Sequence, residues 1–309
     1  TVIGVDNINA YYSPALKRAR LARLARPNFK FHERDIADAD GMAADLAGAR
    51  IDAVVHLAAQ AGVRHSFEHP ATFVPSNLTG FYNVAALAAE RAVRHFVFAS
   101  TSSVYGANPG RPFRETDGAD HPLSFYAATK KANEAMAHAL AHIHGLPTTG
   151  LRFFTVYGPW GRPDMSFFRF ADRIIRGAPI ELHNHGNMTR DFTYIDDIVA
   201  GILAVLDRPP TIDPNWAANP TPATSGAAPY ALFNIGSGAP ASLAAYVDAF
   251  EAAIGKTAIR QYVPMHPGEA VDTHADAGLL AAATGFQPTT ALDEGVRRFV
   301  EWYRAYYRV

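Results

Sequence analysis

Residues 51–57 (IDAVVHL) and 95–99 (HFVFA) are short, nearly continuous apolar runs, and residues 77–93 between them are alanine-rich with helical spacing. Such runs are typical of parallel strands covered on both faces, because each crossover connection lays a helix on the sheet. Similar strands are expected at 2–5 and 150–154, and similar helices at 14–25 and 124–144. The sequence therefore predicts an α/β fold with a doubly wound parallel sheet, in which ligands bind at the carboxyl ends of the strands.

The second half of the chain has a different pattern. After about residue 156 proline and glycine become frequent and the apolar runs shorten. The proline-rich stretch 207–229 is interpreted as a long loop rather than a domain boundary, because a strand at 232–235 and a helix at 242–254 follow it. We expect a first domain over 1–156 and a smaller second domain over 157–309, with parts of 186–240 returning to the first domain.

The composition narrows the function classes. The 309 residues carry a net charge of −1, which argues against a nucleic-acid or anionic membrane partner, since both need excess Lys and Arg. No apolar run is long enough to span a bilayer, and no leading signal segment is visible. The absence of cysteine removes disulfides and thiolate chemistry. These features predict a soluble, cytoplasmic protein.

The clearest local chemistry lies at 100–106 (STSSVYG), at a strand end, and in the helix that follows. Tyr126 and Lys130 are four residues apart and share one face of that helix. An ammonium near a phenol favours the phenolate, which makes the tyrosine a general base and acid. A Tyr-x-x-x-Lys pair arises by chance in roughly one chain in five of this composition. Alone it therefore also fits a surface lysine beside a core tyrosine, but the strand-end hydroxyl of Thr101 favours the catalytic interpretation.

Two further features remain open from the residues alone. Asp6 ends the first apolar run, where an acid either accepts hydrogen bonds from an adenosine ribose or caps the next turn. Residues 236–241 (GSGAPA) formally match a dinucleotide-binding pattern, but Pro240 and the late position argue against it. Ser242 is expected to cap the helix that follows.

Four long motifs identify a family. Residues 101–106 (TSSVYG), 122–134 (PLSFYAATKKANE), 151–165 (LRFFTVYGPWGRPDM) and 190–197 (RDFTYIDD) resemble the extended short-chain dehydrogenase/reductase family, and within it the UDP-glucuronate 4-epimerases. The resemblance implies an NAD-binding Rossmann domain and a smaller C-terminal nucleotide-sugar-binding domain. It also implies a homodimer formed through the helices at 77–93 and 124–144.

The resemblance implies a redox cycle on a UDP-sugar. NAD takes a hydride from sugar C4 while Tyr126 removes the O4 proton, and a 4-keto intermediate is then reduced from its other face. Lys130 would tune Tyr126 and hold the nicotinamide ribose, and Thr101 would orient O4. Two alternatives stay open: a neutral UDP-hexose 4-epimerase, and a non-catalytic sensor of NAD or a nucleotide sugar.

The resemblance also assigns binding residues by position. Besides Tyr126 and Lys130, those expected at the cofactor are Asp6, Asn7, Asp35, Ile36, Leu57, Ala58, Ala59, Asn77 and Phe153. Those expected at the substrate are Arg64, Ser102, Ser103, Thr155, Arg162, Arg190 and Glu269. Glu269 stands where the family has an aspartate. No metal is expected.

Ser102 and Ser103 favour a substrate that carries a carboxylate. A 4-keto uronic acid is a β-keto acid and loses CO₂ unless its carboxylate is held out of alignment with the carbonyl. Hydroxyls can hold it through charge-assisted hydrogen bonds, whereas the acidic residues that related dehydratases and decarboxylases place nearby would repel it. The alternative is that the two serines only cap the strand end.

The start of the chain and one helix face complete the expectations. The family's opening strand and glycine-rich turn have no counterpart, since residues 2–6 resemble its second strand. We expect a further central strand, within roughly thirty more residues, to belong to the molecule.

Glu134, His138 and His142 form an i,i+4 stripe that we expect to face solvent or a dimer partner.

Overall fold

The protein divides into two compact units. The computed structural model describes residues 1–265 and 270–309. Unit 1 comprises Thr1–Pro109, Glu115–Arg152 and Ala204–Phe233, and unit 2 comprises Gly110–Arg114, Phe153–Leu203 and Asn234–Val309. Most strands and helices lie within one unit, whereas β5 (Thr148–Phe153), β10 (Tyr230–Ile235) and α7 (Ile195–Leu206) cross from one unit into the other.

Unit 1 contains a four-stranded sheet with the order β10-β5-β4-β3. Its strands are β3 (Ala53–His56), β4 (His95–Thr101), β5 (Thr148–Phe153) and β10 (Tyr230–Ile235), whose last two residues belong to unit 2. β3 and β4 are parallel, with Val54 opposite Phe96. The apolar runs of the sequence are therefore parallel strands of a Rossmann-like α/β fold, as predicted.

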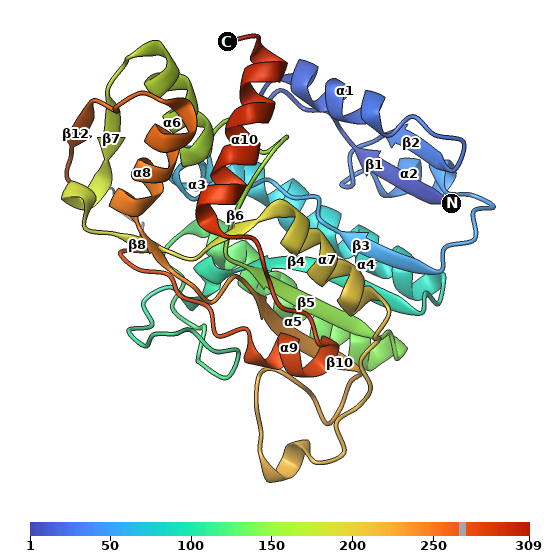
Figure 1. The fold of residues 1–309 in the computed structure, drawn as a ribbon. Helices are drawn as coiled ribbons and strands as arrows, with labels where there is room; N and C mark the ends of the chain where they lie inside the picture. Colours follow the sequence, from blue (N-terminus) through green and yellow to red (C-terminus); the bar gives the residue numbers. More distant parts are fainter. Residues whose placement is uncertain (266–269) are drawn as a thin grey trace. The chain divides into compact units, whose positions relative to one another are not determined.

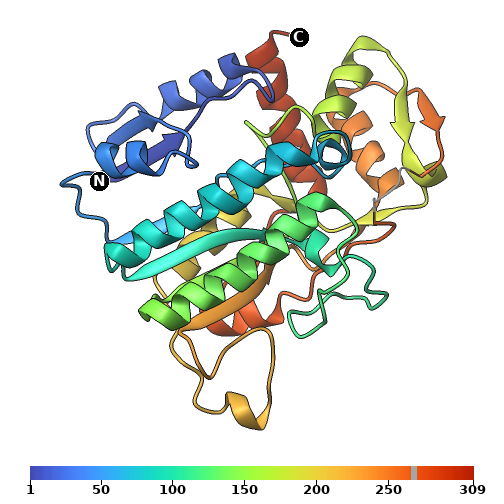
Figure 2. The same cartoon turned by 180° about the vertical axis from the view of Figure 1, so that it is seen from behind.

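The helices of unit 1 follow the predicted crossover pattern. They are α1 (Pro14–Arg23), α2 (Ala39–Asp45), α3 (Val63–Glu68), α4 (Gly80–Glu90) and α5 (Phe125–His144), with short turns η1 (Pro70–Thr72), η2 (Val74–Thr79), η3 (Ser102–Tyr105) and η5 (Trp216–Ala218). α4 and α5 lie side by side across one face of the sheet (Figure 2). α5 begins because the Ser124 hydroxyl accepts the N–H of Ala127, and it ends at Gly145, whose φ of 61° suits glycine.

Aromatic side chains fill the core between this sheet and its helices. The ring of Phe81 from α4 lies 5.9 Å from that of Phe96 and 5.3 Å from that of Phe98, both on β4. None of the three is more than 1% exposed. Packed rings of this size fix how α4 lies on the strand that leads into the 100–106 motif.

The parallel sheet of unit 1 is divided. β1 (Val2–Asp6) and β2 (Phe29–Glu33) form a separate parallel pair, with Val2 opposite Phe29. β3 is the terminal strand of the four-stranded sheet, and Figure 1 shows β1 and β2 apart from it. The expectation that a further strand belongs to this sheet stays a prediction.

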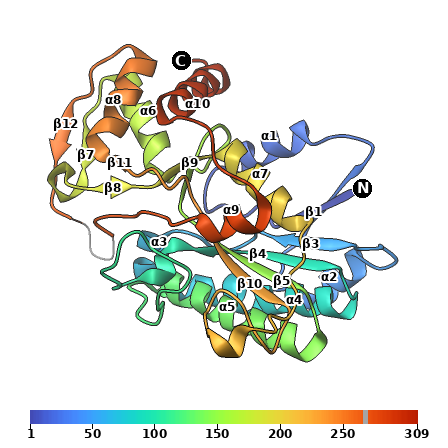
Figure 3. The ribbon, with the colours of Figure 1, turned by 60° about the horizontal axis from the view of Figure 1, so that its bottom comes forward.

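Unit 2 combines short strand pairs with three packed helices. Its strands are β6 (Thr155–Tyr157), β7 (Ile180–Leu182), β8 (Thr189–Arg190), β9 (Phe192–Tyr194), β11 (Ala241–Ser242) and β12 (Arg260–Tyr262). Its helices are α6 (Ser166–Arg176), α7 (Ile195–Leu206, which ends in unit 1), α8 (Leu243–Ile254), α9 (Gly278–Thr284) and α10 (Leu292–Tyr307), with the turn η4 (His183–Gly186). β7 pairs with β12 and β8 with β11 (Figure 3). α8 packs against α6 and α10, and the Ser242 hydroxyl caps α8 as predicted.

No helix in residues 1–265 or 270–309 has both the length and the apolar character needed to cross a bilayer.

Candidate active site

The strand-end hydroxyls surround the turn that follows β4. Thr101, the last residue of β4, accepts the N–H of Ser103 at 3.2 Å and so caps η3. Its hydroxyl also donates to the Ser103 hydroxyl at 3.3 Å. Thr101 is buried, while Ser102 and Ser103 are partly exposed. Capping and an exposed pair of hydroxyls therefore occur together at this strand end.

α5 presents the predicted tyrosine and lysine. Tyr126 lies in the first turn of α5 and is partly exposed, with its ring centre 6.1 Å from that of Phe73. Lys130 lies one turn later and is only 3% exposed. Its Nζ donates to the carbonyl of Ala99 at 2.9 Å, two residues before Thr101. The structure thus attaches the Tyr126–Lys130 helix face directly to the end of β4.

Burial sets the electrostatics around Lys130. Removal from water lowers the pKa of the Lys130 ammonium to about 8. Burial also lowers the pKa of His56, at the end of β3, to about 3, and the charge of Lys130 adds to that effect. His56 is therefore neutral at physiological pH and adds no second cation beside Lys130.

Asn77 links the loop after β3 to α5. Its amide oxygen accepts the N–H of Gln60 at 2.8 Å, and its amide nitrogen donates to the Gln60 carbonyl and to the Thr129 hydroxyl, both at 3.0 Å. Asn133 donates to the Asn77 carbonyl at 2.6 Å. With 1% of its surface exposed, Asn77 fixes the backbone of this loop against the helix that carries Tyr126.

Of the acidic residues expected at the adenosine end, Asp6 is the last residue of β1 and Asp35 lies two residues after β2. The Asp6 carboxylate accepts the N–H of Ile8 at 2.7 Å, so it does cap the turn after β1. The Asn7 amide donates to the Asp35 carboxylate at 2.9 Å, which brings these two predicted cofactor residues into contact. Asp35 also accepts the N–H of Ala37 at 2.9 Å.

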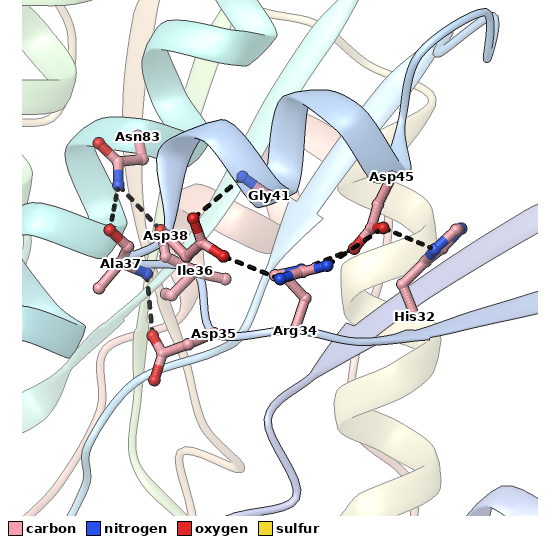
Figure 4. A network of polar contacts seen from close by, with 9 residues as sticks. All are labelled: His32, Arg34, Asp35, Ile36, Ala37, Asp38, Gly41, Asp45 and Asn83. Carbon is pink, nitrogen blue, oxygen red and sulfur yellow. Dashed lines mark hydrogen bonds and ion pairs between the residues drawn. The ribbon is translucent and has the colours of Figure 1, made fainter.

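A polar network, which includes Asp35, holds the segment after β2 (Figure 4). The Arg34 guanidinium bonds the carboxylates of Asp38 and Asp45, each at 2.8 Å. The amide of Asn83 on α4 donates to the carbonyl of Ile36 at 3.0 Å. The backbone at Asp35 and Ile36 is therefore fixed from both α2 and α4.

The residues after β3 and on α3 also lie in unit 1. Leu57 is 53% exposed, unusual for a large apolar side chain beside a parallel strand, and Ala58 and Ala59 are partly exposed. Arg64 lies in the first turn of α3. An exposed apolar surface at the carboxyl end of a strand suits the flat face of a nucleotide cofactor.

The other predicted binding residues lie in unit 2. Phe153 ends β5 and Thr155 begins β6. Arg162 pairs with the carboxylate of Asp164 at 3.2 Å, and Arg190 on β8 donates to the carbonyls of Thr189 and Val271, both at 2.8 Å. Glu269 lies outside the described residues.

Sequence reasoning missed a buried ion pair in unit 1. Arg152 on β5 is fully buried, and its Nε and Nη2 bond the two carboxylate oxygens of Glu134 at 2.8 and 2.9 Å. Ser100 donates to the same carboxylate at 2.7 Å. A lone arginine inside the apolar run 150–154 was the available signal, since a buried cation needs a partner.

The expectation that Glu134, His138 and His142 face solvent or a dimer partner is wrong for Glu134, whereas His142 is exposed and His138 partly exposed. Glu134 is 3% exposed because it pairs with Arg152. His138 bonds the Ser225 hydroxyl at 2.9 Å, and His142 bonds the Ala227 carbonyl at 2.6 Å. The loop 207–229 therefore packs on this face of α5.

The glycine pattern at 236–241 serves a buried carboxylate in unit 2. Asp191, with no exposed surface, accepts the N–H groups of Ser237 at 2.7 Å and of Gly238 and Ala275 at 3.0 Å, together with the Ser237 hydroxyl at 2.8 Å. Gly238 has a φ of 68°, which favours glycine. The pattern therefore forms a turn that is held by the protein itself.

Comparisons with known proteins agree on one family. Residues 1–219 match the model of the NAD dependent epimerase/dehydratase family. The chain is 47% identical to a probable UDP-glucuronate 4-epimerase of Rhizobium meliloti (strain 1021), covering 99% of this chain and 91% of that protein. It is 44% identical to UDP-glucuronate 4-epimerase 1 of Arabidopsis thaliana, covering 99% of this chain and 71% of that protein.

A solved structure agrees with the sequence relatives. The crystal structure of UDP-glucuronic acid 4-epimerase from Bacillus cereus, in complex with UDP-glucuronic acid and NAD, has a TM-score of 0.83 and 29% identity. The match covers 99% of this chain and 91% of that one. With the strand-end hydroxyls, the Tyr126–Lys130 helix and these matches together, the chain belongs to the NAD dependent epimerase/dehydratase family.

Proposed function

We propose that this protein is an NAD-dependent 4-epimerase that interconverts UDP-glucuronate and UDP-galacturonate. The observation that carries the proposal is the buried Lys130 ammonium, one helical turn from Tyr126 and bonded to the strand that ends in Thr101. The named relatives, and the complex of the Bacillus cereus enzyme with UDP-glucuronic acid and NAD, support the same substrate and cofactor.

The donor and acceptor set of unit 1 suits NAD. Asp6 places a carboxylate at the end of β1, where the adenosine ribose would lie, and Asp35 and Ile36 would flank the adenine. The cofactor would be lined by Leu57, Ala58, Ala59 and Phe153, with Asn77 behind it. Lys130 would hold the nicotinamide ribose. When bound, NAD supplies reversible hydride acceptance at sugar C4.

The side chains of unit 1 supply the proton chemistry. The Tyr126 phenolate accepts the O4 proton, and the resulting phenol returns it when the C4 centre is reformed, so the proton balances over the cycle. The Lys130 cation stabilises the phenolate form. The Thr101 hydroxyl, fixed by its contacts with Ser103, orients O4.

Ser102 and Ser103 determine what happens to the uronate. Their hydroxyls lie in the turn after Thr101 and are partly exposed, so they can bond the substrate carboxylate. Holding that group out of alignment with the C4 carbonyl prevents loss of CO₂. The site therefore favours epimerisation over decarboxylation.

The two units take different tasks in this proposal. Unit 1, which falls largely within the expected domain 1–156, binds NAD, and unit 2 contributes Thr155, Arg162 and Arg190 to UDP-sugar binding. Arginine suits this task because its planar fork bonds phosphate oxygens in pairs. Glu269 is assigned to the uridine end. Cysteine-free composition supports a cytoplasmic location.

A homodimer completes the proposal. Tyr82 on α4, and Phe125 and Ile143 on α5, are 53%, 40% and 68% exposed. Large apolar side chains exposed on two adjacent helices are typical of a protein interface. We assign the partner to a second copy of this chain.

The deciding experiment incubates the purified protein with UDP-glucuronate and follows the C4 epimer and CO₂. We expect the epimer without CO₂, and NAD released on denaturation. Tyr126→Phe should reduce kcat by at least about 100-fold, the size of a lost general acid–base, while UDP-glucuronate still binds in calorimetry. Unchanged turnover in this variant would refute the assigned base, and stoichiometric CO₂ would identify a decarboxylase instead.

A further inference from the structure

The buried ion pair of unit 1 has no part in the chemistry proposed above. Glu134 and Arg152 are 3% and 0% exposed, and neither is assigned to substrate or cofactor. Burial alone would raise the pKa of Glu134, but the hydrogen bonds and charge of Arg152 lower it overall, so the pair is ionised. A buried pair of this kind is a weak source of stability, because apolar residues of similar volume often serve as well. Stability alone therefore does not account for this pair.

Glu134 and Lys130 attach α5 to successive residues of one strand. Lys130 donates to the carbonyl of Ala99, and Glu134, one helical turn later, accepts the hydroxyl of Ser100 at 2.7 Å. Thr101 comes next. Two contacts one turn apart fix both the rotation and the translation of the helix against the strand. The position of Tyr126 relative to Thr101 depends on them.

Arg152 also contacts η3, the turn that contains Ser102 and Ser103. Its guanidinium carbon lies 4.7 Å from the centre of the Tyr105 ring, and Tyr105 ends η3. Tyr105 is 1% exposed, so the contact is enclosed. One guanidinium therefore bonds Glu134 on α5 and supports the far end of the turn that holds Ser102 and Ser103.

We propose that Glu134 and Arg152 are positioning residues, which hold Tyr126 and Lys130 on α5 in register with Thr101, Ser102 and Ser103. The contacts are Glu134–Ser100, Glu134–Arg152 and Arg152–Tyr105. The inference rests on the proposed function for its kinetic consequence. Catalytic geometry is sensitive to displacements of about 1 Å, which cost about 100-fold in rate.

The main test uses Glu134→Gln, which keeps the volume but places an amide N–H₂ against the guanidinium. We expect kcat for UDP-glucuronate epimerisation to fall about 10- to 100-fold, with KM and bound NAD within about threefold of the wild type. Arg152→Lys keeps the cation and should recover part of the kcat that Arg152→Met loses. An unchanged kcat in Glu134→Gln would overturn the proposal.

A matched control separates positioning from a general loss of stability. His95 and Thr149 form a buried hydrogen bond of 2.9 Å between the same two strands, β4 and β5, at their opposite ends. Thr149→Val should lower the melting temperature but leave kcat unchanged. If the Glu134 variant fails to fold, the paired Glu134→Leu/Arg152→Met variant removes both charges with similar volume. A folded pair variant with wild-type kcat would also overturn the proposal.

A readout without substrate keeps this inference distinct from the proposed function. In protein with ¹³C-labelled tyrosine rings, the Tyr126 resonance is the one missing from Tyr126→Phe. We expect Glu134→Gln to move that resonance and Thr149→Val to leave it in place. If the wild type epimerises nothing, the proposed function fails, while a moved resonance still supports positioning. A resonance that stays in place counts against positioning whatever the activity.

Discussion

At the scale of single residues, the hydroxyl of Thr101, the last residue of β4, has more than one task. The Thr101 oxygen accepts the Ser103 N–H and donates to the Ser103 hydroxyl, and in the proposed reaction it also orients O4. Fixed hydroxyls of this kind are arranged before substrate arrives, which spares the cost of ordering them during the reaction. A charge introduced among them should therefore act on the substrate directly.

Ser103→Glu tests whether the substrate carboxylate needs uncharged hydroxyls beside it. A carboxylate here would repel the uronate, so KM for UDP-glucuronate should rise about tenfold or more, the size of roughly 1–2 kcal/mol of like-charge repulsion near a surface. Ser103→Gln matches the size without the charge and is the control. Steady-state kinetics of both variants decide the matter, since equal KM values would mean that bulk, not charge, causes the effect.

The lowered pKa of Lys130 predicts how kcat changes at alkaline pH. Its pKa is about 8, so as pH rises above 8 the ammonium loses its proton and the phenolate of Tyr126 loses its cation. We expect kcat to fall between about pH 8 and 10, and Lys130→Arg to flatten that fall. Lys256→Met, which removes an exposed lysine of unit 2, should leave the profile unchanged. A wild-type kcat that stays level to pH 10 contradicts the assignment.

The same lysine has the opposite effect on stability. The unfolded chain holds this proton up to about pH 10.4, so between pH 8 and 10 the unfolded state binds more protons than the folded state. The free energy of unfolding should therefore rise with pH in this window through Lys130, and Lys130→Met should remove that rise. Urea unfolding of both proteins at pH 8 and 10 measures the difference.

At the scale of elements, the sequence predicted the helices and strands that are long enough to show a periodic apolar pattern. The apolar runs at 51–57 and 95–99 became β3 and β4, and the helix expected at 124–144 became α5 within one residue. Unit 2 was harder because strands such as β8 and β11 have two residues each, too few for a pattern. The helix expected from residue 77 begins at Gly80, after the π-helical turn that holds Asn77.

The candidate site was predictable where chemistry is local and hidden where it depends on packing. Tyr126 and Lys130 share a helix face by spacing alone. Glu134 and Arg152 lie 18 positions apart on different elements, so their pairing follows only from how α5 lies on the sheet. The hydrogen bonds to Asp191 could not be predicted for the same reason, since the donors lie more than 40 positions away in the sequence.

The buried carboxylate of Asp191 gives a prediction about the stability of unit 2. Asp191→Asn should lower the free energy of unfolding by about 3 kcal/mol, because an amide nitrogen facing buried N–H groups leaves at least one of them without an acceptor, at about 1–3 kcal/mol each. Asp196→Asn, an exposed neighbour on α7, should change it by less than about 0.5 kcal/mol. Urea unfolding followed by tryptophan fluorescence compares them, and equal values would show that the 236–238 turn does not depend on this carboxylate.

At the scale of the whole molecule, the proposed function divides the work between the two units. Unit 1, whose parallel strands form two separate sheets, would supply the proton chemistry, and unit 2 would supply Arg190 from a short strand and Arg162 from a loop. α4 and α5 lie across one face of the unit 1 sheet (Figure 2). Both helices contribute to the buried core, yet each also leaves apolar side chains exposed. Water contact of such side chains is unfavourable by about 25 cal/mol for each Å² of apolar surface, which a partner subunit would remove.

The homodimer is tested by charging that surface. Tyr82 and Ile143 are 53% and 68% exposed, so Tyr82→Asp/Ile143→Asp should disturb neither the core nor the secondary structure. If α4 and α5 meet a second copy, each substitution buries a carboxylate in both subunits, and sedimentation should show the mass of a monomer where the wild type is a dimer. Leu24→Asp, at a 46% exposed position after α1, is the matched control and should remain dimeric. A wild type that sediments as a monomer would contradict the homodimer. A doubly charged variant that stays dimeric would show that the interface lies elsewhere.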